Sequence, residues 1–474
     1  MEPQLLSETY AEQLDGVLSC YDRLILTGSV QPLCYAKGMT KYLYDHGIRI
    51  FDYAQFAQPL REAIRNNAKA LAAANGLEIE CIRKNDFRKA DRIQELLKTR
   101  GTQPGLVHIF SAMEPCTSYQ PWHDQATGKT YLKPDTGKCQ HYYFYFIDAD
   151  LGLCYLRVPT WCPFRLQFYC NGHAWLASQL RSQGIAFEQV DNAFVHIADY
   201  PRANALAAQC DVKQLQAKLA DLARQYCPVV TTLNLVHTWS LMQVEYATDL
   251  VFKQPADLQA FCPQLLETLI HTVKPVDIAT FLSKKLHGNY QGEMGNRYHV
   301  RRLGTCLKHR MGPVSIKMYD KFQHVLRIET TTSDVTFFQQ YRTVHHRNGK
   351  ATTQWAKMPK ALFSLKPLRD LLAAANQRYL KFISAVATPH VGVPSPGCVD
   401  PDPGRGSAPL QGLQSLERGR CQPVPRAAAR RVRDQRFHQQ GLAGAAARAH
   451  LRPDQSLTDA PPYSQADQEG RPPL

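Results

Sequence analysis

The stretch LEIECIRKNDFRKADRIQELLKTRGTQPGLVHIFS, residues 77–111, decides the fold class. Residues 77–82 and 106–111 are short apolar runs of the length of a strand. Between them, residues 89–99 carry apolar side chains at helical spacing. A strand, a helix and a second strand in succession favour an α/β sheet that is partly parallel.

The alternation continues on the N-terminal side of this stretch. Ser7 can cap a helix that runs to about Cys20, because a serine hydroxyl accepts a bond from a free backbone N–H. Residues 22–28 have the character of a strand. A long helical pattern over 53–75 ends at Gly76, a residue favoured just after a helix. These elements extend the α/β pattern.

On the C-terminal side, residues 113–139 are polar and contain turn signals at 127–129 and 135–138, which predicts a loop. The runs 141–147 and 153–158 flank the turn sequence DADLG and predict a hairpin. Further helices are expected at 174–183, 201–226 and 256–271.

A second sheet is expected from Val314 onward, because apolar and polar side chains alternate over 314–319. A strand at 325–331, a hairpin around Asn348-Gly349 and a closing helix at 365–385 follow. The predicted fold class is therefore mixed α/β (α+β), with a mixed-sheet N-terminal domain before a basic β-rich domain. The expected domains are an α/β region at 1–112, a hairpin with helices that continues it at 113–230, the basic β-rich domain with its closing helix at 231–386, and a disordered tail at 387–474.

Composition is that of a globular protein with a sizeable core. The chain has 474 residues, 44% of them hydrophobic, and no run of eighteen apolar residues that would span a membrane. The N-terminus lacks a basic region followed by an apolar one, so no secretory signal is expected. The fourteen cysteines form no Cys-x-x-Cys pair, which indicates reduced, mostly buried thiols. We therefore expect a cytoplasmic protein.

Positive charge is concentrated in one part of the chain. The net charge is +15, and residues 281–360 hold fifteen Lys and Arg against four acids. Such a segment suits a polyanion, because phosphate neutralisation and counterion release dominate nucleic-acid affinity. The alternative is a solvated basic face without a nucleic-acid partner. DNA is the predicted partner, and no membrane partner is expected. The predicted DNA-binding residues are Lys284, Lys285, Arg297, Arg301, Arg302, Lys308, Arg310, Lys317, Lys321 and Arg327.

The chemistry of the sequence changes after residue 387. No lysine follows Lys381, eleven arginines lie between Gly404 and Leu474, and thirteen of the thirty prolines lie from Pro389 onward. No hydrophobic period is present, which predicts a disordered tail. Codons can be chosen for residues 413–471 that give stop-free amphipathic text one nucleotide later, with two helical patterns split by a Pro-Gly turn. We interpret the tail as a frameshifted winged-helix sequence, which the gene sequence can test.

Several phrases of the chain resemble a family of bacterial proteins that are often labelled MarR-family transcriptional regulators. They are YDR at 21–23, YAKGMT at 35–40, GLVHIFSAME at 105–114, YLRVPTWCPFR at 155–165, MQVEYATD at 242–249 and LHGNY at 286–290. The resemblance covers residues 21–384 and implies a bacterial, transcriptional-regulator-like DNA-binding protein. In similar proteins a helix-turn-helix sequence follows this body in frame. Its absence here implies that the winged helix is lost in this copy.

The sequence KMYDK at 317–321, followed by LRIE at 326–329, resembles the paired strands of rolling-circle replication initiators. This resemblance implies a nickase of a mobile element, in which a tyrosine attacks a phosphodiester and a bound metal polarises the phosphate. The predicted catalytic residues are Tyr319, Asp320 and Glu329, and the predicted metal ligands are Glu245 and Asp249. Mg²⁺ or Mn²⁺ is the cofactor expected of such a nuclease, and no other cofactor is expected.

Two observations leave the chemistry open. The sequence lacks the His-hydrophobic-His metal pair that those nickases carry. An ion-pair network, in which Arg327 and Lys321 neutralise Asp320 and Glu329, is the structural alternative. Two functions therefore remain, a non-enzymatic DNA-binding protein and a DNA-processing enzyme that uses Tyr319. Other carboxylates that such an enzyme could use are Asp22, Asp148 and Asp150.

Overall fold

The computed structural model describes residues 5–83, 87–209, 211–286, 289–301, 304–346 and 348–387. The chain divides into two compact units, residues 1–342 with 354–390, and residues 343–353 with 391–474. Of the second unit, the structure describes 343–346 and 348–353. The predicted disordered and frameshifted tail lies, after Ala387, outside the described residues.

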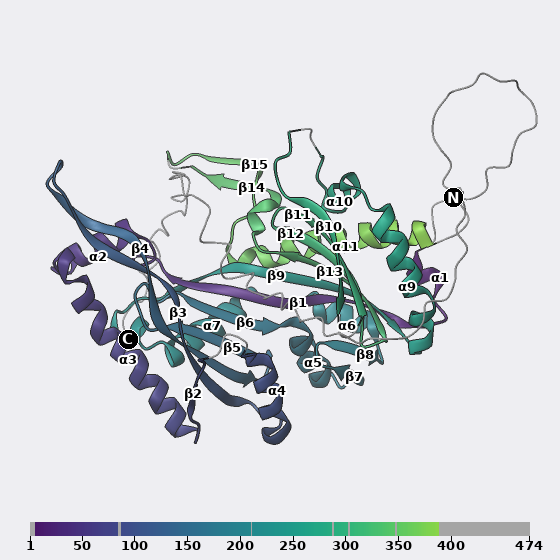
Figure 1. Ribbon diagram of the computed structural model, residues 1–474, viewed down its shortest axis with the longest axis horizontal. Helices are drawn as coiled ribbons and strands as arrows, with labels where there is room; N and C mark the ends of the chain where they lie inside the picture. Colours follow the sequence, from purple (N-terminus) through teal and green to yellow (C-terminus); the bar gives the residue numbers. More distant parts are fainter. Residues whose placement is uncertain are drawn as a thin grey trace, which may run out of the picture. The chain divides into compact units, whose positions relative to one another are not determined.

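Helices occupy much of the first unit (Figure 1). They are α1 (Leu6–Thr9), α2 (Ala36–Asp45), α3 (Tyr53–Ala74), α4 (Lys89–Arg100), α5 (Gly172–Ser182), α6 (Tyr200–Ala207), α7 (Val212–Tyr226), α8 (Val229–Thr232), α9 (Pro255–Thr272), α10 (Pro275–Phe281) and α11 (Leu365–Ala387).

The strands include several that are unusually long. They are β1 (Leu14–Val30), β2 (Ile79–Cys81), β3 (Gly105–Asp124), β4 (Lys129–Asp148), β5 (Gly152–Pro159), β6 (Leu166–Asn171), β7 (Phe187–Val190), β8 (Ala193–Ile197), β9 (His237–Phe252), β10 (Met294–Arg301), β11 (Gly304–Met311), β12 (Val314–Lys321), β13 (Val325–Thr332), β14 (Gln339–His345) and β15 (Ala351–Lys357).

One sheet of eleven strands runs through the first unit in the order β10-β11-β12-β13-β9-β1-β6-β5-β4-β3-β2. Helices and a large sheet together confirm the predicted mixed α/β class. The predicted second sheet is wrong, because β13 pairs with β9 and so joins the basic strands to the N-terminal ones. No sheet boundary falls at the predicted domain limits either, since β3 crosses residue 112 and β9 pairs with both β1 and β13.

The two halves of this sheet follow the same path (Figure 1). After β1 come α2 and α3, and then β3, β4, β5 and β6 return until β6 pairs with β1. After β9 come α9 and α10, and β10, β11, β12 and β13 return until β13 pairs with β9. Because β1 and β9 pair antiparallel, an approximate two-fold rotation relates the halves. We infer that the fold is an internal repeat.

Strand alternation places different cores on the two faces of the sheet. The larger core packs even-numbered residues of β12 and β13, such as Met318 and Ile328, together with side chains of α3, α9 and α11. On the opposite face, a small core packs Val251 and Val325 with α5, α6 and β8. Another small core packs Ile93 of α4 with β3 and β4. Polar side chains of the same face lie between these two small cores.

The stretch at 77–111 behaves as its sequence predicts. β2 and β3 pair in parallel, with α4 between them in the chain, and every other neighbouring pair in the large sheet is antiparallel. A parallel pair needs such a crossover, whereas antiparallel strands can be joined by short turns. The predicted partly parallel sheet is thus correct for this one pair.

Two local predictions are wrong. The predicted loop at 113–139 is the paired ribbon of β3 and β4, with its turn at Gly128. Backbone hydrogen bonds hold such a ribbon without the apolar alternation that marks a half-buried strand. The predicted helix at 7–20 ends at Thr9, because residues from Leu14 onward belong to β1. That strand contributes Leu26 to the larger core and Leu18 to a small core, so both of its faces are covered and its apolar residues lack a clear period.

Candidate active site

Four central strands gather the polar residues of the site. Tyr319 of β12 lies opposite Arg327 of β13, which lies opposite Asp249 of β9. Two residues along, Lys317 lies opposite Glu329. Residues that face each other across a sheet project to the same side. Consecutive strands therefore place these side chains on one face.

A β-bulge in β1 adds Asp22 to this group. Tyr21 pairs with Tyr246 and Leu24 with Val244, so Asp22 and Arg23 together lie opposite Glu245. An extra residue of this kind redirects a side chain, and bulges are frequent beside active sites. Asn171 and Asn192 each donate a hydrogen bond to Oδ1 of Asp22, at 2.9 and 2.8 Å. The carboxylate of Asp22 is thereby fixed in orientation.

Three buried carboxylates meet at this point. Oxygen atoms of Asp22, Glu245 and Glu329 all lie within 4.8 Å of one another, and the three residues are only 4%, 5% and 2% exposed. We call these three residues the carboxylate cluster. Carboxylate oxygens are the ligands that Mg²⁺ and Mn²⁺ prefer. The donor set of the cluster therefore suits either cation.

Tyr319 is bound directly to the carboxylate cluster. Its hydroxyl donates to Oε2 of Glu329 at 2.8 Å, and Nζ of Lys317 donates to Oε1 of the same carboxylate at 2.5 Å. Burial, and then the negative charge of Glu329, raise the pKa of Tyr319 well above its usual value. The hydroxyl is therefore protonated at neutral pH, and it needs a base before its oxygen can act as a nucleophile. Glu329 is in place to accept that proton.

Glu245 is the member of the cluster whose negative charge is least compensated. Burial and the neighbouring Glu329 raise the pKa of Glu245. Lys317 and Arg23 act in the opposite direction, but they lie 3.8 and 3.7 Å from its carboxylate oxygens. A cation bound between Glu245 and Glu329 would relieve this repulsion. The uncompensated charge of Glu245 and the oxygen ligands of the carboxylate cluster therefore both favour a bound cation.

A fully buried ion network supports the cluster from one side. Arg327 is 0% exposed, and its Nε and Nη2 donate to the two oxygens of Asp249 at 2.7 and 2.6 Å. The Nη2 atom also lies 2.8 Å from Nε2 of His173. Burial raises the pKa of Asp249, but Arg327 and His173 outweigh it and hold this pKa at about 2. Nη1 of Arg327 lies 3.6 Å from Oδ2 of Asp22, so the network touches the cluster.

The structure brings together some of the residues that the sequence predicts for catalysis and metal binding. Tyr319, Glu329 and Glu245 share one site. Asp320 does not join them, since successive side chains of a strand point to opposite faces, and its carboxylate instead accepts from Gln259 at 2.6 Å. Asp249 is occupied by Arg327 and lies outside the carboxylate cluster.

The predicted DNA-binding residues separate into two groups. Arg327 is wholly buried, so the prediction that it contacts DNA is wrong, whereas Lys321 is partly buried and donates to Asn192. Lys317 is bound to Glu329, and Lys284 donates to the carbonyl of Phe337 at 2.9 Å. The side chain of Arg301, and all of Arg302, lie outside the described residues. The predicted residues that remain at the surface are Lys285, Arg297, Lys308 and Arg310.

Sequence reasoning missed how the cluster is completed. Asp22 appears in the sequence only as one of several scattered carboxylates, and the pairing of Lys317 with Glu329 needs the strand register. The sequence did not point to Asn171 and His173 at the start of α5 or to Asn192 in the turn between β7 and β8, because only the tertiary structure brings them to the cluster. The alternative prediction of an ion-pair network, with Arg327 and Lys321 neutralising Asp320 and Glu329, has the wrong partners. Arg327 pairs with Asp249, and Lys317 pairs with Glu329.

Comparison with known proteins does not assign the chain to a family. A scan against models of protein families gives no match, and a search of curated proteins finds no related sequence. Among the helices that the structure describes, none is both long enough and apolar enough to cross a membrane.

Proposed function

We propose that this protein is a DNA-processing enzyme that cleaves a DNA strand with Tyr319 as its nucleophile. One observation carries the proposal: the hydroxyl of Tyr319 donates to Glu329, whose carboxylate belongs to a cluster of three. A nucleophile, a base that can take its proton and a set of hard oxygen ligands therefore lie at one point of the sheet.

The reaction we propose is a transesterification. The oxygen of Tyr319 forms a bond to phosphorus while its proton passes to Glu329. The bond from phosphorus to the 3′ oxygen of the DNA breaks, and that oxygen takes up a proton and leaves as a 3′ hydroxyl. The products are a 5′-phosphotyrosine link and a nicked strand. Lys317 carries a positive charge beside Glu329 and can stabilise charge that develops on the phosphate.

Asp22, Glu245 and Glu329 are the residues that would hold a divalent cation. A bound Mg²⁺ or Mn²⁺ would polarise the phosphate and offset the negative charge that raises the pKa of Tyr319. Oε1 of Glu329 accepts from Lys317 and Thr331, and Oε2 accepts from Tyr319. Each carboxylate oxygen has two lone pairs, so Oε2 keeps one for a cation.

A row of basic side chains leads across the sheet to this point. Arg297 of β10 lies opposite Lys308 of β11, Lys308 opposite Lys317 of β12, and Lys317 opposite Glu329. The Arg297 side chain is 64% exposed, and the neighbouring positive charges help to lower the pKa of Lys308, after burial. Adjacent strands lie about 4.8 Å apart. The row therefore presents successive positive charges along which a DNA backbone can lie.

The hairpin of β14 and β15 offers a second surface for DNA. Residues 339–357 contain four Lys and Arg and no acid. Tyr341 and Trp355 are 60% and 67% exposed, and their ring centroids lie 6.0 Å apart. Exposed aromatic rings beside positive charge bind single strands, because every base has a face that can stack. We therefore expect this hairpin to hold unpaired bases.

A plasmid assay tests the enzymatic proposal. With Mg²⁺ or Mn²⁺ we expect the full chain to convert supercoiled plasmid into relaxed circles and to leave a protein–DNA adduct that survives detergent. EDTA should abolish both products, because the carboxylates alone leave the phosphate unpolarised. Glu245→Gln should require more metal for the same rate. If neither cation supports nicking, the enzymatic proposal fails.

Binding to labelled single strands tests the role of the hairpin. We expect Trp355→Ala to weaken binding about tenfold or more, since one base stacked on an aromatic ring contributes about 1–3 kcal/mol. Trp122→Ala is a matched control, because Trp122 is also exposed, at 43%, and lies under Lys133 on the β3–β4 ribbon. Equal losses in the two variants, or none in Trp355→Ala, would contradict this assignment.

The second candidate is a DNA-binding protein without catalysis, similar to a transcriptional regulator. One observation favours it: Lys317, Arg23 and Arg327 offset much of the negative charge of the site without any metal. The winged helix that such a regulator would use is lost in this copy in our interpretation of the sequence, and the tail in its place lies outside the described residues. DNA binding without nicking in the plasmid assay would support this candidate.

A further inference from the structure

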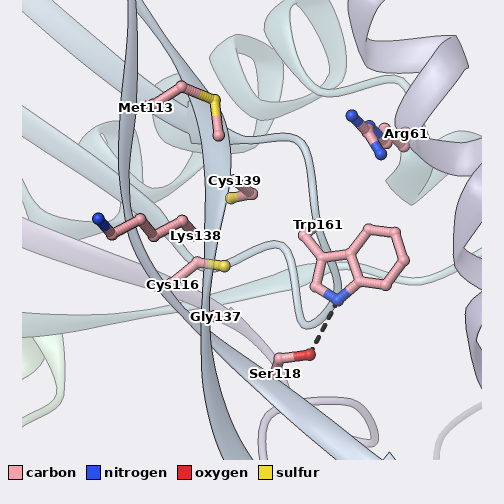
Figure 2. Close-up of a pocket in the computed structure, with 8 residues that line it drawn as sticks. All are labelled: Arg61, Met113, Cys116, Ser118, Gly137, Lys138, Cys139 and Trp161. Carbon is pink, nitrogen blue, oxygen red and sulfur yellow. Dashed lines mark hydrogen bonds between the residues drawn. The ribbon is translucent and has the colours of Figure 1, made fainter.

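A pocket of about 200 Å³ lies on the β3–β4 ribbon, away from the carboxylate cluster. Nε1 of Trp161 donates to Oγ of Ser118 at 2.9 Å, so the indole is fixed across the pocket from the two strands (Figure 2). Arg61 of α3 brings positive charge to its wall, whereas the side chain of Lys138 of β4 points away from it (Figure 2). The remaining lining residues are Met113, Cys116, Gly137 and Cys139.

Two cysteines adjoin each other in this pocket. Cys116 lies opposite Gly137, and Glu114 lies opposite Cys139, so the two cysteines are diagonal neighbours on one face of the ribbon. Both cysteines line the same pocket, so their side chains lie close to each other. In Figure 2 both sulfur atoms lie beside the strands, across from Trp161. Cys116 is partly exposed, whereas Cys139 is 7% exposed.

The surroundings of Cys139 favour its thiolate. Nδ1 of His141 lies 3.8 Å from Sγ of Cys139. The hydrogen bond from Cys116 and then His141 outweigh burial, and lower the pKa of Cys139 to about 5. The other charged groups near the pair are Glu114, Arg157, Arg61 and Lys138. Positive neighbours and a hydrogen-bond donor are the features that make a cysteine nucleophilic.

We propose that Cys139 is a reactive site for small peroxides and that Cys116 resolves the product as a disulfide. The sulfur of Cys139 attacks one oxygen of the peroxide, the O–O bond breaks, and a sulfenic acid and a hydroxide form. The sulfur of Cys116 then attacks the sulfur of the sulfenic acid, and water leaves. In sum, two thiols and hydrogen peroxide give one disulfide and two waters. The strand pairing of the ribbon makes the two cysteines diagonal neighbours, so the reacting atoms start close together.

The pocket matches this class of reagent. Hydrogen peroxide is little larger than water, and a space of about 200 Å³ beside the two cysteines admits it. Arg61, which lies across the pocket from the strands, can stabilise the hydroxide that leaves. None of these residues belongs to the carboxylate cluster, so the reaction does not depend on the function proposed for Tyr319.

Peptide mass spectrometry after brief treatment with hydrogen peroxide tests the proposal. In the full chain we expect a Cys116–Cys139 disulfide to form at least about tenfold faster than oxidation of Cys81, an exposed cysteine that serves as the control. In Cys116→Ser, Cys139 should accumulate as a sulfenic acid that dimedone traps. His141→Gln should slow the reaction without removing either sulfur.

Two results would overturn this inference. One is oxidation of Cys81 as fast as that of Cys139. The other is a Cys116→Ser protein whose Cys139 gives no dimedone adduct. The first result is measured on the wild-type chain, so it does not depend on whether a variant folds. Loss of DNA nicking in any variant has no bearing on either result.

Discussion

Replacing Tyr319 by phenylalanine is expected to reduce plasmid nicking by at least about a thousandfold, as removal of a nucleophile does in other enzymes. The detergent-resistant adduct should disappear as well, because the attacking oxygen is gone. DNA binding should remain, since the basic row of Arg297 and Lys308 is untouched. Lys317 and Thr331 still donate to Glu329 in this variant, so the carboxylate keeps partners.

Tyr143→Phe is the matched control for this experiment. Its hydroxyl also donates to a glutamate, Glu114, at 2.7 Å, and Arg157 lies 3.0 Å from that carboxylate. The pair therefore repeats the tyrosine, acid and cation of the proposed site without two further acids nearby. Tyr143→Phe should nick at the wild-type rate. Nicking by Tyr319→Phe at the wild-type rate would rule out Tyr319 as the nucleophile.

Replacing Arg327 by methionine is expected to lower the free energy of unfolding by about 3–5 kcal/mol. The change removes two hydrogen bonds to Asp249 and leaves that carboxylate buried without its cation. Uncompensated charge is costly there because Asp249 is only 1% exposed. Urea unfolding measures the loss, and Arg327→Lys, which keeps the charge, should lose less.

Arg297→Met is the control for the stability measurement. Arg297 forms an ion pair with Glu293 at 3.2 Å, but both side chains are more than half exposed. Exposed pairs of this kind contribute at most about 1 kcal/mol. A second test is the double variant Arg327→Met with Asp249→Leu, which should recover stability because no buried charge is left unpaired. A loss below about 1 kcal/mol in Arg327→Met would show that Asp249 does not depend on this partner.

The sequence predicts much of the local structure, because strands and helices have distinct spacing of apolar residues. The helix at 53–75 is α3, and the closing helix at 365–385 is α11. The hairpin around Asn348-Gly349 is β14 and β15. The prediction is wrong at 113–139, where a long ribbon carries polar residues on its exposed positions. The polar amino-acid composition of this stretch reflects its exposure to water. It does not indicate whether the backbone is paired in a ribbon.

The sequence predicts Tyr319, Glu329 and Glu245 as site residues, but local spacing explains only why the first two meet. Tyr319 and Glu329 lie on consecutive strands joined by a short turn, so alternation alone brings them to one face. Asp320 is adjacent to Tyr319 in the chain and for that reason faces the other way. Two residues that are adjacent in a strand therefore do not belong to the same site on one face of the sheet.

The sequence by itself determined the class of fold, the concentration of positive charge in 281–360 and the pairing of Tyr319 with Glu329. Only the tertiary structure decided that one sheet joins both halves of the chain and that Asp22 completes the carboxylate cluster. The reason is physical. Local spacing fixes which face a side chain takes within its own strand, whereas the partner of that strand depends on burial and register over more than two hundred residues. Asp22 and Glu245 meet only because a bulge in β1 turns an extra residue toward β9.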